Sequence, residues 1–238
     1  MSVSHIIADL HLSEERPDIT EGFLLYLQKV ASEADHLYIL GDFFEVWVGD
    51  DYTDPTIDRV AEALSLRSQQ GLNTYFCHGN RDFLLGQQFC ARAGMHLLAE
   101  ETLVQLAGQT ALLMHGDSLC IDDKEYQSFR KMVREAHWQQ EFLQQPLIAR
   151  LAIAKQLRNQ SKKASREKAQ DIMDVNPLAV KDTCQRFAAN VLVHGHTHRP
   201  ADHQDGNIRR LVVGDWDQHM HFVKADSTGL SLIKWQWN

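Results

Sequence analysis

Short apolar runs alternate with longer amphipathic stretches along the first half of the chain. The apolar runs are bounded by turn residues and predict buried strands at 3–8, 37–40, 74–77 and 111–114. The amphipathic stretches predict helices at 19–31, 56–70 and 83–93. Gly71 and Gly94 follow the last two helices, where a helix commonly ends. This alternation predicts an α/β fold with a largely parallel sheet and helices on its faces.

The pattern changes after Asp123, where strand-like runs stop until residue 190. Apolar residues recur three and four positions apart from Tyr126 to Ala136, and a second helical run follows Pro146. Strands are predicted again at 190–194, 210–214, 220–225 and 230–235. We therefore expect a core formed by residues 1–119 and 176–238, interrupted by a helical insertion at 120–175.

Charge is distributed unevenly over these two parts. The chain has a formal net charge of −8, which argues against a general nucleic-acid binder. Residues 124–170 hold eleven Lys and Arg but only four acids, a net +7, so the remainder carries −15. The insertion is thus built differently from the core.

Cysteines and apolar segments indicate the compartment. The four cysteines, which are widely spaced and form no C-x-x-C pair, predict a reduced, cytoplasmic protein. The first twelve residues lack a basic segment and are interrupted by Asp9, so a strand is expected there and not a signal peptide. No run approaches the ~18 apolar residues of a spanning helix, so any membrane contact is expected to be peripheral.

Five polar motifs follow predicted strands directly. They are Asp9-x-His11, Gly41-Asp42, Gly79-Asn80-Arg81-Asp82, His115-Gly116-Asp117 and His194-Gly195-His196-Thr197-His198. Ligands of open α/β sheets bind outside the carboxyl ends of the strands, so the five motifs are expected to converge. Carboxylate, imidazole and amide-oxygen donors suit Mn, Fe, Zn or Co.

Local backbone geometry is expected to bring the donor groups of these motifs close together. Side chains two apart in an extended segment point to the same side, which would pair Asp9 with His11 and His196 with His198. Glycines beside Asp42, Asn80 and His196 would allow a close approach of the backbone. Any one motif arises by chance in many chains, and a single His at a strand end is usually structural. The ordered occurrence of all five favours a metal site.

The ordered motifs resemble those of the calcineurin-like metallophosphoesterase superfamily. The resemblance implies a four-layer αββα sandwich with a helical cap insertion. It also implies one cation held by Asp9, His11, Asp42 and His198, and a second held by Asn80, His115, His196 and the bridging Asp42. Two such ions clamp phosphoryl oxygens and activate a water for in-line attack. The resemblance implies catalytic roles for Asp42, Asn80, Arg81 and His115.

Arg81 departs from the superfamily pattern G-N-H-[DE], whose His assists the leaving group. A guanidinium has a pKa above about 12, so it is a poor general acid, although it binds phosphate in a bidentate manner. Arg81 therefore favours a leaving group that needs no proton, such as a phosphate. This points to pyrophosphate cleavage.

Longer segments narrow the resemblance over essentially the whole chain. Segments 38–51, 78–84, 112–120, 171–176, 194–200 and 213–216 resemble the UDP-2,3-diacylglucosamine hydrolases of lipid A biosynthesis. The resemblance implies attack of water on the α-phosphorus, giving UMP and 2,3-diacylglucosamine 1-phosphate, with two Mn²⁺ ions. It also implies a peripheral protein on the cytoplasmic face of the bacterial inner membrane, which we expect to be a monomer.

The insertion is expected to bind the acylated substrate. Trp138, Phe142, Leu143, Leu147, Ile148 and Leu151 offer more apolar surface than a short excursion can bury, and the basic residues from Arg150 to Lys168 suit phosphates and anionic headgroups. By resemblance, the substrate contacts are Asn80, Arg81, Asp123, Ser161, Ser165, Lys168 and His196, and Tyr126 could also reach the substrate. A solvated helical excursion is the simpler alternative.

Two other functions compete with this interpretation. A metallophosphoesterase acting on a soluble nucleotide or nucleic acid would keep the metals and lose the lipid, but the apolar insertion argues against it. A non-enzymatic scaffold on the same fold would lack ligands, and all seven ligand positions are filled.

Overall fold

Two β-sheets form the centre of the molecule. The computed structural model describes residues 2–167, 172–217 and 219–237, with no side chain described at 162 and 164–167. The first sheet has the order β11-β10-β1-β2-β3-β4, and the second has the order β5-β6-β7-β9-β8. The strands of the first sheet are β1 (Ser4–Ile7), β2 (His36–Leu40), β3 (Asn73–Cys77), β4 (Met95–Leu97), β10 (Met220–Asp226) and β11 (Gly229–Trp235). Those of the second are β5 (Thr102–Leu106), β6 (Gln109–Leu113), β7 (Val191–His194), β8 (Ala201–Asp205) and β9 (Ile208–Val212).

Strand direction confirms the parallel centre of each sheet. β1 to β4 are parallel to one another, as are β6, β7 and β9. The strands β10, β11, β5 and β8 pair in antiparallel fashion towards the edges. The sequence prediction missed β4, β5 and β8. The sequence of β8, ADHQD, has no apolar pattern because this strand is an edge with mostly exposed side chains.

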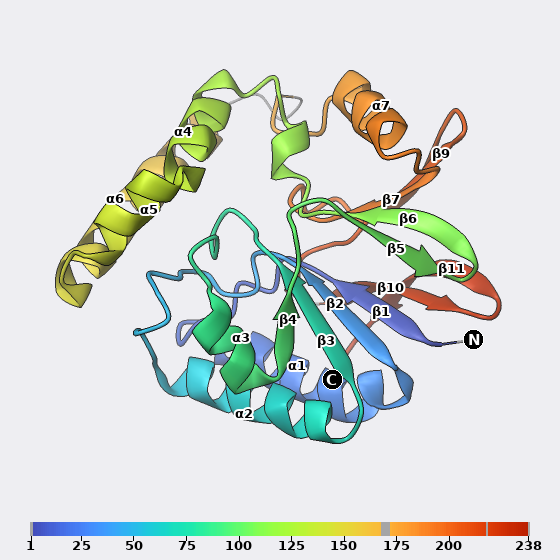
Figure 1. Cartoon of the computed structure of the whole chain (residues 1–238), viewed down its shortest axis with the longest axis horizontal. Coiled ribbons are helices and arrows are strands. Elements are labelled where there is room, and N and C mark those ends of the chain that lie inside the picture. Colours follow the sequence, from blue (N-terminus) through green and yellow to red (C-terminus); the bar gives the residue numbers. More distant parts are fainter. Residues whose placement is uncertain (1, 168–171, 218, 238) are drawn as a thin grey trace.

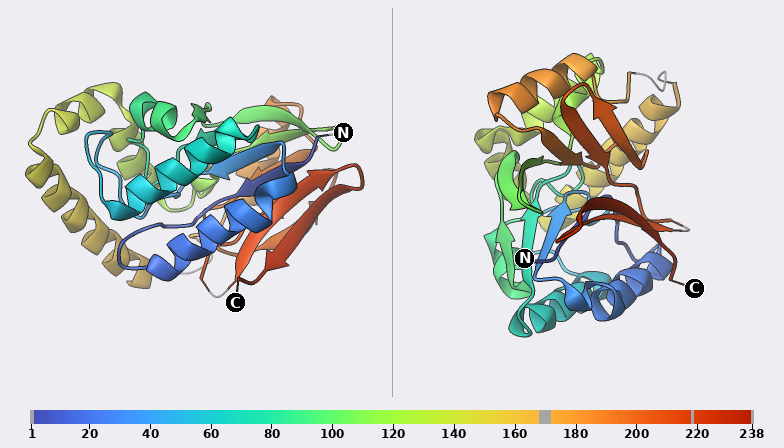
Figure 2. Two further views of the ribbon diagram at one scale, coloured as in Figure 1. Left: turned by 90° about the horizontal axis from the view of Figure 1, so that it is seen from below. Right: turned by 90° about the vertical axis from the view of Figure 1, so that its right-hand side faces the viewer.

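Helices cover the outer faces of both sheets (Figures 1 and 2). The helices α1 (Pro17–Lys29), α2 (Pro55–Gln69) and α3 (Gln87–Ala93) lie against the first sheet, and α7 (Pro177–Arg186) lies against the second. One buried cluster joins Ile6 and Leu40 of the first sheet to Leu113 and Val193 of the second. The predicted four-layer αββα sandwich is therefore confirmed.

Local sequence explains the helix ends. The Asp54 side chain accepts a hydrogen bond from Ile57 N at 2.8 Å, and Pro55 occupies the first turn of α2. Asn176 caps α7 in the same way through Leu178 N at 2.9 Å. This helix was not predicted.

The predicted helix at 83–93 is too long. The structure begins α3 at Gln87, because residues 83–84 form a turn and residues 85–86 are irregular. The Asp50 carboxylate accepts hydrogen bonds from Gly86 N at 2.8 Å and Phe89 N at 3.0 Å, which satisfies the amides that start the helix. This contact comes from a distant segment, so local periodicity could not reveal it.

Three helices project beside the sandwich at the carboxyl end of its strands (Figure 1). They are α4 (Lys124–Arg134), α5 (Ala136–Leu143) and α6 (Leu147–Glu167), and together we call them the cap. They occupy the predicted insertion. Among the helices of the described residues, none has the length and apolar character needed to cross a membrane.

Candidate active site

All seven predicted metal ligands lie in loops that follow strands, at one end of the two sheets. Asp9 and His11 follow β1, Asp42 follows β2, Asn80 follows β3, His115 follows β6, and His196 and His198 follow β7. The structure brings these loops together from 190 residues of sequence, as the predicted topology implies.

Three donor atoms form a tight triangle on one side of the site. Asn80 Oδ1 lies 2.9 Å from His115 Nε2 and 2.9 Å from His196 Nδ1, and the two ring nitrogens are 3.2 Å apart. Ligands about 2.1 Å from one ion and at right angles are separated by about 3.0 Å. The triangle therefore has the dimensions of one face of a metal coordination sphere.

The hydrogen bonding of His115 supports this assignment. Its Nδ1 lies 2.8 Å from the carbonyl oxygen of Leu40, to which it can only donate. In the neutral form that metal binding requires, the ring presents the lone pair of Nε2 towards Asn80 Oδ1, which is also an acceptor. A cation between the two acceptors resolves their repulsion, so the donor set fits a metal.

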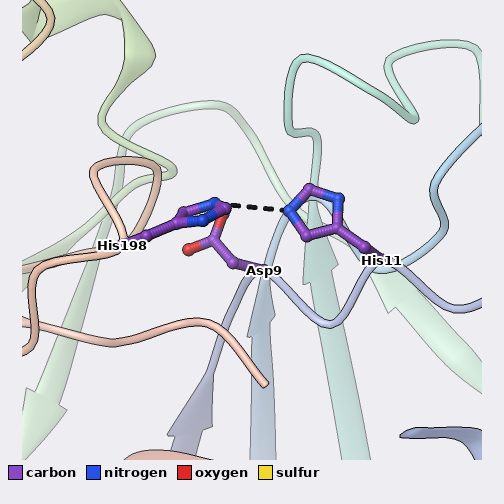
Figure 3. A group of neighbouring side chains, drawn as sticks. All are labelled: Asp9, His11 and His198. Atoms are coloured by element: carbon purple, nitrogen blue, oxygen red, sulfur yellow. Dashed lines mark hydrogen bonds and ion pairs between the residues drawn. The ribbon is translucent and has the colours of Figure 1, made fainter. Parts of the chain in front are cut away.

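Asp9, His11 and His198 form a second group (Figure 3). The Nε2 atoms of the two histidines are 3.3 Å apart, and His198 Nε2 lies 3.5 Å from Asp9 Oδ1. Asp9 Oδ2 accepts the amide hydrogen of His196 at 2.8 Å. Asp9 Oδ1 is buried and has no hydrogen-bond donor among the described residues. An acceptor oriented in this way is suited to a cation.

Asp42 lies between the two groups. Its Oδ2 is 3.9 Å from His11 Nε2, and its Oδ1 is 3.8 Å from His115 Nε2. The carboxylate is almost fully buried, and Oδ1 also accepts the backbone amide of Arg81 at 2.8 Å. This position suits the bridging role that the resemblance implied.

Backbone strain is concentrated at these ligands. Seven described residues other than glycine have a positive φ, and five of them are Asp9, His11, Asp42, His196 and His198. The prediction that D-x-H and H-x-H are extended is therefore wrong, because each of the four residues adopts a left-handed conformation. Such a conformation costs about 1–3 kcal/mol, and it persists only where the surrounding fold enforces it.

Two glycines allow the loops of Asp42 and Asn80 to touch. A Cβ at Gly41 would lie 2.3 Å from Gly79 N, and a Cβ at Gly79 would lie 2.2 Å from Asp42 N. Asp82 holds the same loops, because its carboxylate accepts the amides of Gly79 at 2.8 Å and Phe43 at 2.7 Å. Asp82 is fully buried.

Carboxylates also orient the histidines from behind. His198 Nδ1 lies 3.4 Å from Asp215, and His11 Nδ1 lies 3.1 Å from Glu45. Such contacts direct the opposite ring nitrogen towards a metal. Sequence reasoning gave no role to Asp82, Asp215 or Glu45. Segments 78–84, 213–216 and 38–51 contain them, but their roles depend on partners distant in sequence.

The pKa values of the histidines reflect these neighbours. Burial would lower the pKa of His198, but the contacts with Asp215 and Asp9 outweigh it and raise the pKa to about 10. Desolvation of the half-buried His196 ring, together with the neighbouring His115, lowers the pKa of His196 to about 4. Neutral His196 therefore offers a lone pair at neutral pH.

Comparison with known proteins identifies the family. Residues 5–200 match the model of the calcineurin-like phosphoesterase family. The chain belongs to this family. A solution NMR structure of a Thermotoga maritima protein covers the whole of both chains, with a TM-score of 0.51 and 16% sequence identity. This likeness supports the fold alone.

Relatives with closer sequences share one name, UDP-2,3-diacylglucosamine hydrolase. One in Chromohalobacter salexigens is 51% identical over 215 residues, covering 89% of this chain and 87% of the relative. Another in Stutzerimonas stutzeri is 46% identical over 228 residues, covering 94% of this chain and 95% of the relative.

A cavity of about 310 Å³ extends from the ligands of this phosphoesterase to the cap. At one end it is lined by Asn80 and Arg81, and the Arg81 Nε lies 3.6 Å from Asp42 Oδ2. Further along, the lining includes Trp138 and Phe142, whose rings stack at 5.1 Å. The cavity thus joins a cationic, metal-binding end to an aromatic wall.

The apolar residues of the cap divide into two sets. Trp138 and Phe142 line the cavity, and Leu147 and Leu151 pack against the core of the sandwich. Leu143 and Ile148 instead face solvent, and the Ile148 side chain is 84% exposed. The sequence predicts one apolar surface from these residues, but the folded helices point them in two directions.

Four arginines of the cap point inwards. Arg130 contacts Asp117 and Glu100, and Arg134 donates to the carbonyl oxygen of Gly79. Arg150, which is 3% exposed, pairs with Asp51, and Arg158 pairs with Glu45. The positive charge of the insertion is therefore partly used to attach the cap to the acidic core.

The predicted substrate contacts are only partly brought to the cavity. Asn80, Arg81, Asp123 and Ser161 line it, and Asp123 also caps α4 by accepting the amide hydrogen of Tyr126 at 3.1 Å. His196 lies in the metal group and stacks on the Tyr126 ring at 5.9 Å. The side chain of Ser165 and the whole of Lys168 lie outside the described residues.

Proposed function

We propose that this phosphoesterase hydrolyses the pyrophosphate bond of UDP-2,3-diacylglucosamine, giving UMP and 2,3-diacylglucosamine 1-phosphate. The cavity carries the proposal, because it places Asn80 and Arg81 beside the ligand cluster and continues to the aromatic wall of the cap. A charged diphosphate fits one end and an acyl chain fits the other. The relatives that bear this name support the same substrate.

Two divalent cations, which we propose to be Mn²⁺, would supply Lewis-acid activation of water and of the phosphoryl oxygens. Asp9, His11, Asp42 and His198 would hold one ion, and Asp42, Asn80, His115 and His196 the other. The buried carboxylates and the strained loops fix these side chains before substrate arrives, so little reorganisation is needed.

Arg81 is proposed to bind the diphosphate. Its backbone amide is held by Asp42, and its Nε is buried without a hydrogen-bond acceptor among the described residues. The guanidinium would neutralise charge on the departing sugar 1-phosphate, which leaves as an anion and needs no proton. Asp123 and Ser161 would contact the sugar and acyl groups, as would Ser165 and Lys168.

Isotope labelling tests the reaction and its position together. The chain would be incubated with UDP-2,3-diacylglucosamine, an unacylated UDP-sugar or a model phosphodiester in H₂¹⁸O, with and without Mn²⁺. We expect rapid turnover only of the acylated nucleotide, only with metal, and with ¹⁸O in UMP. Label in the lipid phosphate would refute α-attack, and equal turnover of the unacylated sugar would refute the lipid substrate.

We propose further that residues 120–175 act as a cap for the acyl chains and dock the protein, as a monomer, on the cytoplasmic face of the inner membrane. Ile148 and Leu143 are exposed, and Lys155 and Lys163 are exposed further along α6. This combination of apolar and basic side chains suits an anionic bilayer surface. Co-sedimentation with anionic vesicles at two salt concentrations tests this proposal.

The variants distinguish docking through this surface from nonspecific adsorption to vesicles. Ile148→Asp with Lys155→Glu is expected to reduce vesicle binding several-fold, because it removes both apolar contact and charge. Leu178→Asp, at an exposed leucine of α7, is the control and should bind as wild type. Undiminished binding of the Ile148 and Lys155 variant would rule out this surface.

A further inference from the structure

Glu45 touches both a metal-ligating histidine and the cap. Its Oε2 lies 3.1 Å from His11 Nδ1, and its Oε1 accepts from Arg158 Nε at 2.7 Å and lies 2.6 Å from Arg158 Nη2. His11 is in the loop after β1, whereas Arg158 lies in α6. One carboxylate thus uses a different oxygen for each partner.

The backbone holds Glu45 beside His11. His11 N donates to Asp42 O at 2.9 Å, Leu12 N donates to Phe43 O at 2.9 Å, and Glu45 N donates to Leu12 O at 3.1 Å. These bonds form a short ladder between the two loops, so the spacing between the Glu45 and His11 side chains is set by the core.

The Arg158 contact, in contrast, depends on where α6 lies. Both partners are only about one-fifth exposed, with side-chain exposures of 22% for Glu45 and 20% for Arg158. The guanidinium approaches Oε1 with two nitrogens, so the ion pair holds the position of that oxygen. Movement of α6 away from the core would release Oε1 and, with it, the orientation of Oε2 towards His11.

We infer that Glu45 is a positioning residue that couples the place of α6 to metal binding at His11. The inference rests on the proposed two-cation site. Among the described residues, His11 Nδ1 makes no aligned hydrogen bond, although Glu45 Oε2 lies 3.1 Å away. A cation on Nε2 would place the His11 proton on Nδ1, where it would donate to Glu45, so metal binding would favour the Glu45 rotamer that also contacts Arg158. Coupling of this kind is reciprocal: metal binding stabilises the docked α6, and docked α6 strengthens metal binding.

Calorimetric titration of the metal-free chain with Mn²⁺ measures one direction of the coupling. Glu45→Gln keeps the size of the side chain but removes the charge, and we expect it to weaken binding at one ion by about tenfold or more. Arg158→Met leaves Glu45 in place and should weaken the same ion by a few-fold. Glu33→Gln is the control, because Glu33 is exposed and pairs only with Lys224 in the described contacts.

Hydrogen exchange of the α6 amides measures the other direction. We expect Mn²⁺ to slow exchange around residues 150–161 in the wild type and in Glu33→Gln, and to leave it unchanged in Glu45→Gln. Metal-insensitive exchange in the wild type would overturn the coupling. So would an Arg158→Met variant with wild-type metal affinity, which would reduce Glu45 to a local partner of His11.

These readouts separate the inference from the proposed function. A wild-type chain that binds no Mn²⁺ refutes the two-cation site on which both depend. A wild type that binds two ions and hydrolyses the lipid, together with Glu45→Gln of unchanged affinity, refutes the coupling alone. Thermal melting of each variant without metal confirms that affinity is compared between folded proteins.

Discussion

Asp117 attaches the cap to the catalytic loops, and its removal should loosen both. The residue is 1% exposed and lies two positions after His115. Its Oδ2 accepts from the Tyr126 hydroxyl at 2.6 Å and from Arg130 Nε at 2.8 Å. Burial and the adjacent carboxylate raise the pKa of Tyr126 well above its usual value, so the hydroxyl remains a donor.

The size of the effect follows from these two contacts. Asp117→Asn keeps an acceptor oxygen but loses the charge, which contributes about half the strength of each bond. A bond to a charged group contributes about 1.5–3 kcal/mol, so losing half of two such bonds should cost about 1.5–3 kcal/mol. For a chain of this size, that lowers Tm by about 3–12 °C. Asp117→Ala removes the acceptor entirely and should cost about 3–6 kcal/mol.

Activity should fall together with stability. Tyr126 stacks on His196 at 5.9 Å, so a displaced α4 shifts one wall of the site. We expect kcat/KM to drop about tenfold or more in Asp117→Asn, since small misplacements of a site are costly. Circular dichroism melts and the turnover assay measure the two effects, with exposed Asp182→Asn of α7 as control. An Asp117→Asn protein that melts with the wild type would refute this account.

Four further outcomes are expected. Asp42→Ala should lower kcat at least a thousandfold, because one carboxylate serves both ions. A folded variant with kcat within tenfold of the wild type would exclude Asp42 as the bridging ligand. Arg81→His should slow hydrolysis of the UDP-lipid, and any gain in rate should be confined to a phosphodiester whose leaving group needs a proton. Parallel assays of the two substrates measure both rates. Trp138→Ala with Phe142→Ala should raise KM for the acylated substrate about tenfold and leave Mn²⁺ affinity unchanged in calorimetry. Burial lowers the pKa of His5 to about 4 in the folded chain, so on acidification the unfolded chain binds this proton first. The free energy of unfolding, measured in urea, should therefore be highest above about pH 6.5 and fall towards pH 4, and the fall should be smaller in His5→Gln.

Much of this protein could be predicted from its sequence because local signals carry the information. Apolar runs located β1, β2, β3, β6 and β7, and the polar residues directly after them contain all seven candidate ligands. The rule that ligands bind at the carboxyl ends of parallel strands then predicted their convergence. A basic, helical insertion was also visible, since its composition differs from that of the core.

Other features depend on contacts between distant segments. The turn before α3 depends on Asp50, and β8 is an edge whose polar residues have no periodicity. The left-handed backbone at Asp9 and His11 runs against the local preference of non-glycine residues, so only the surrounding fold can enforce it. Sequence-based periodicity assigns such residues to an extended strand.

The same distinction applies to the site. The residue types that could bind cations are visible in the sequence, because the donors stand in short motifs after strands. The role of the cap's positive charges emerges only on folding: Arg150 and Arg158 meet Asp51 and Glu45, about a hundred residues earlier in the chain, and not the solvent. An ion pair forms where folding places its partners, and that distance in space cannot be read from spacing along the chain.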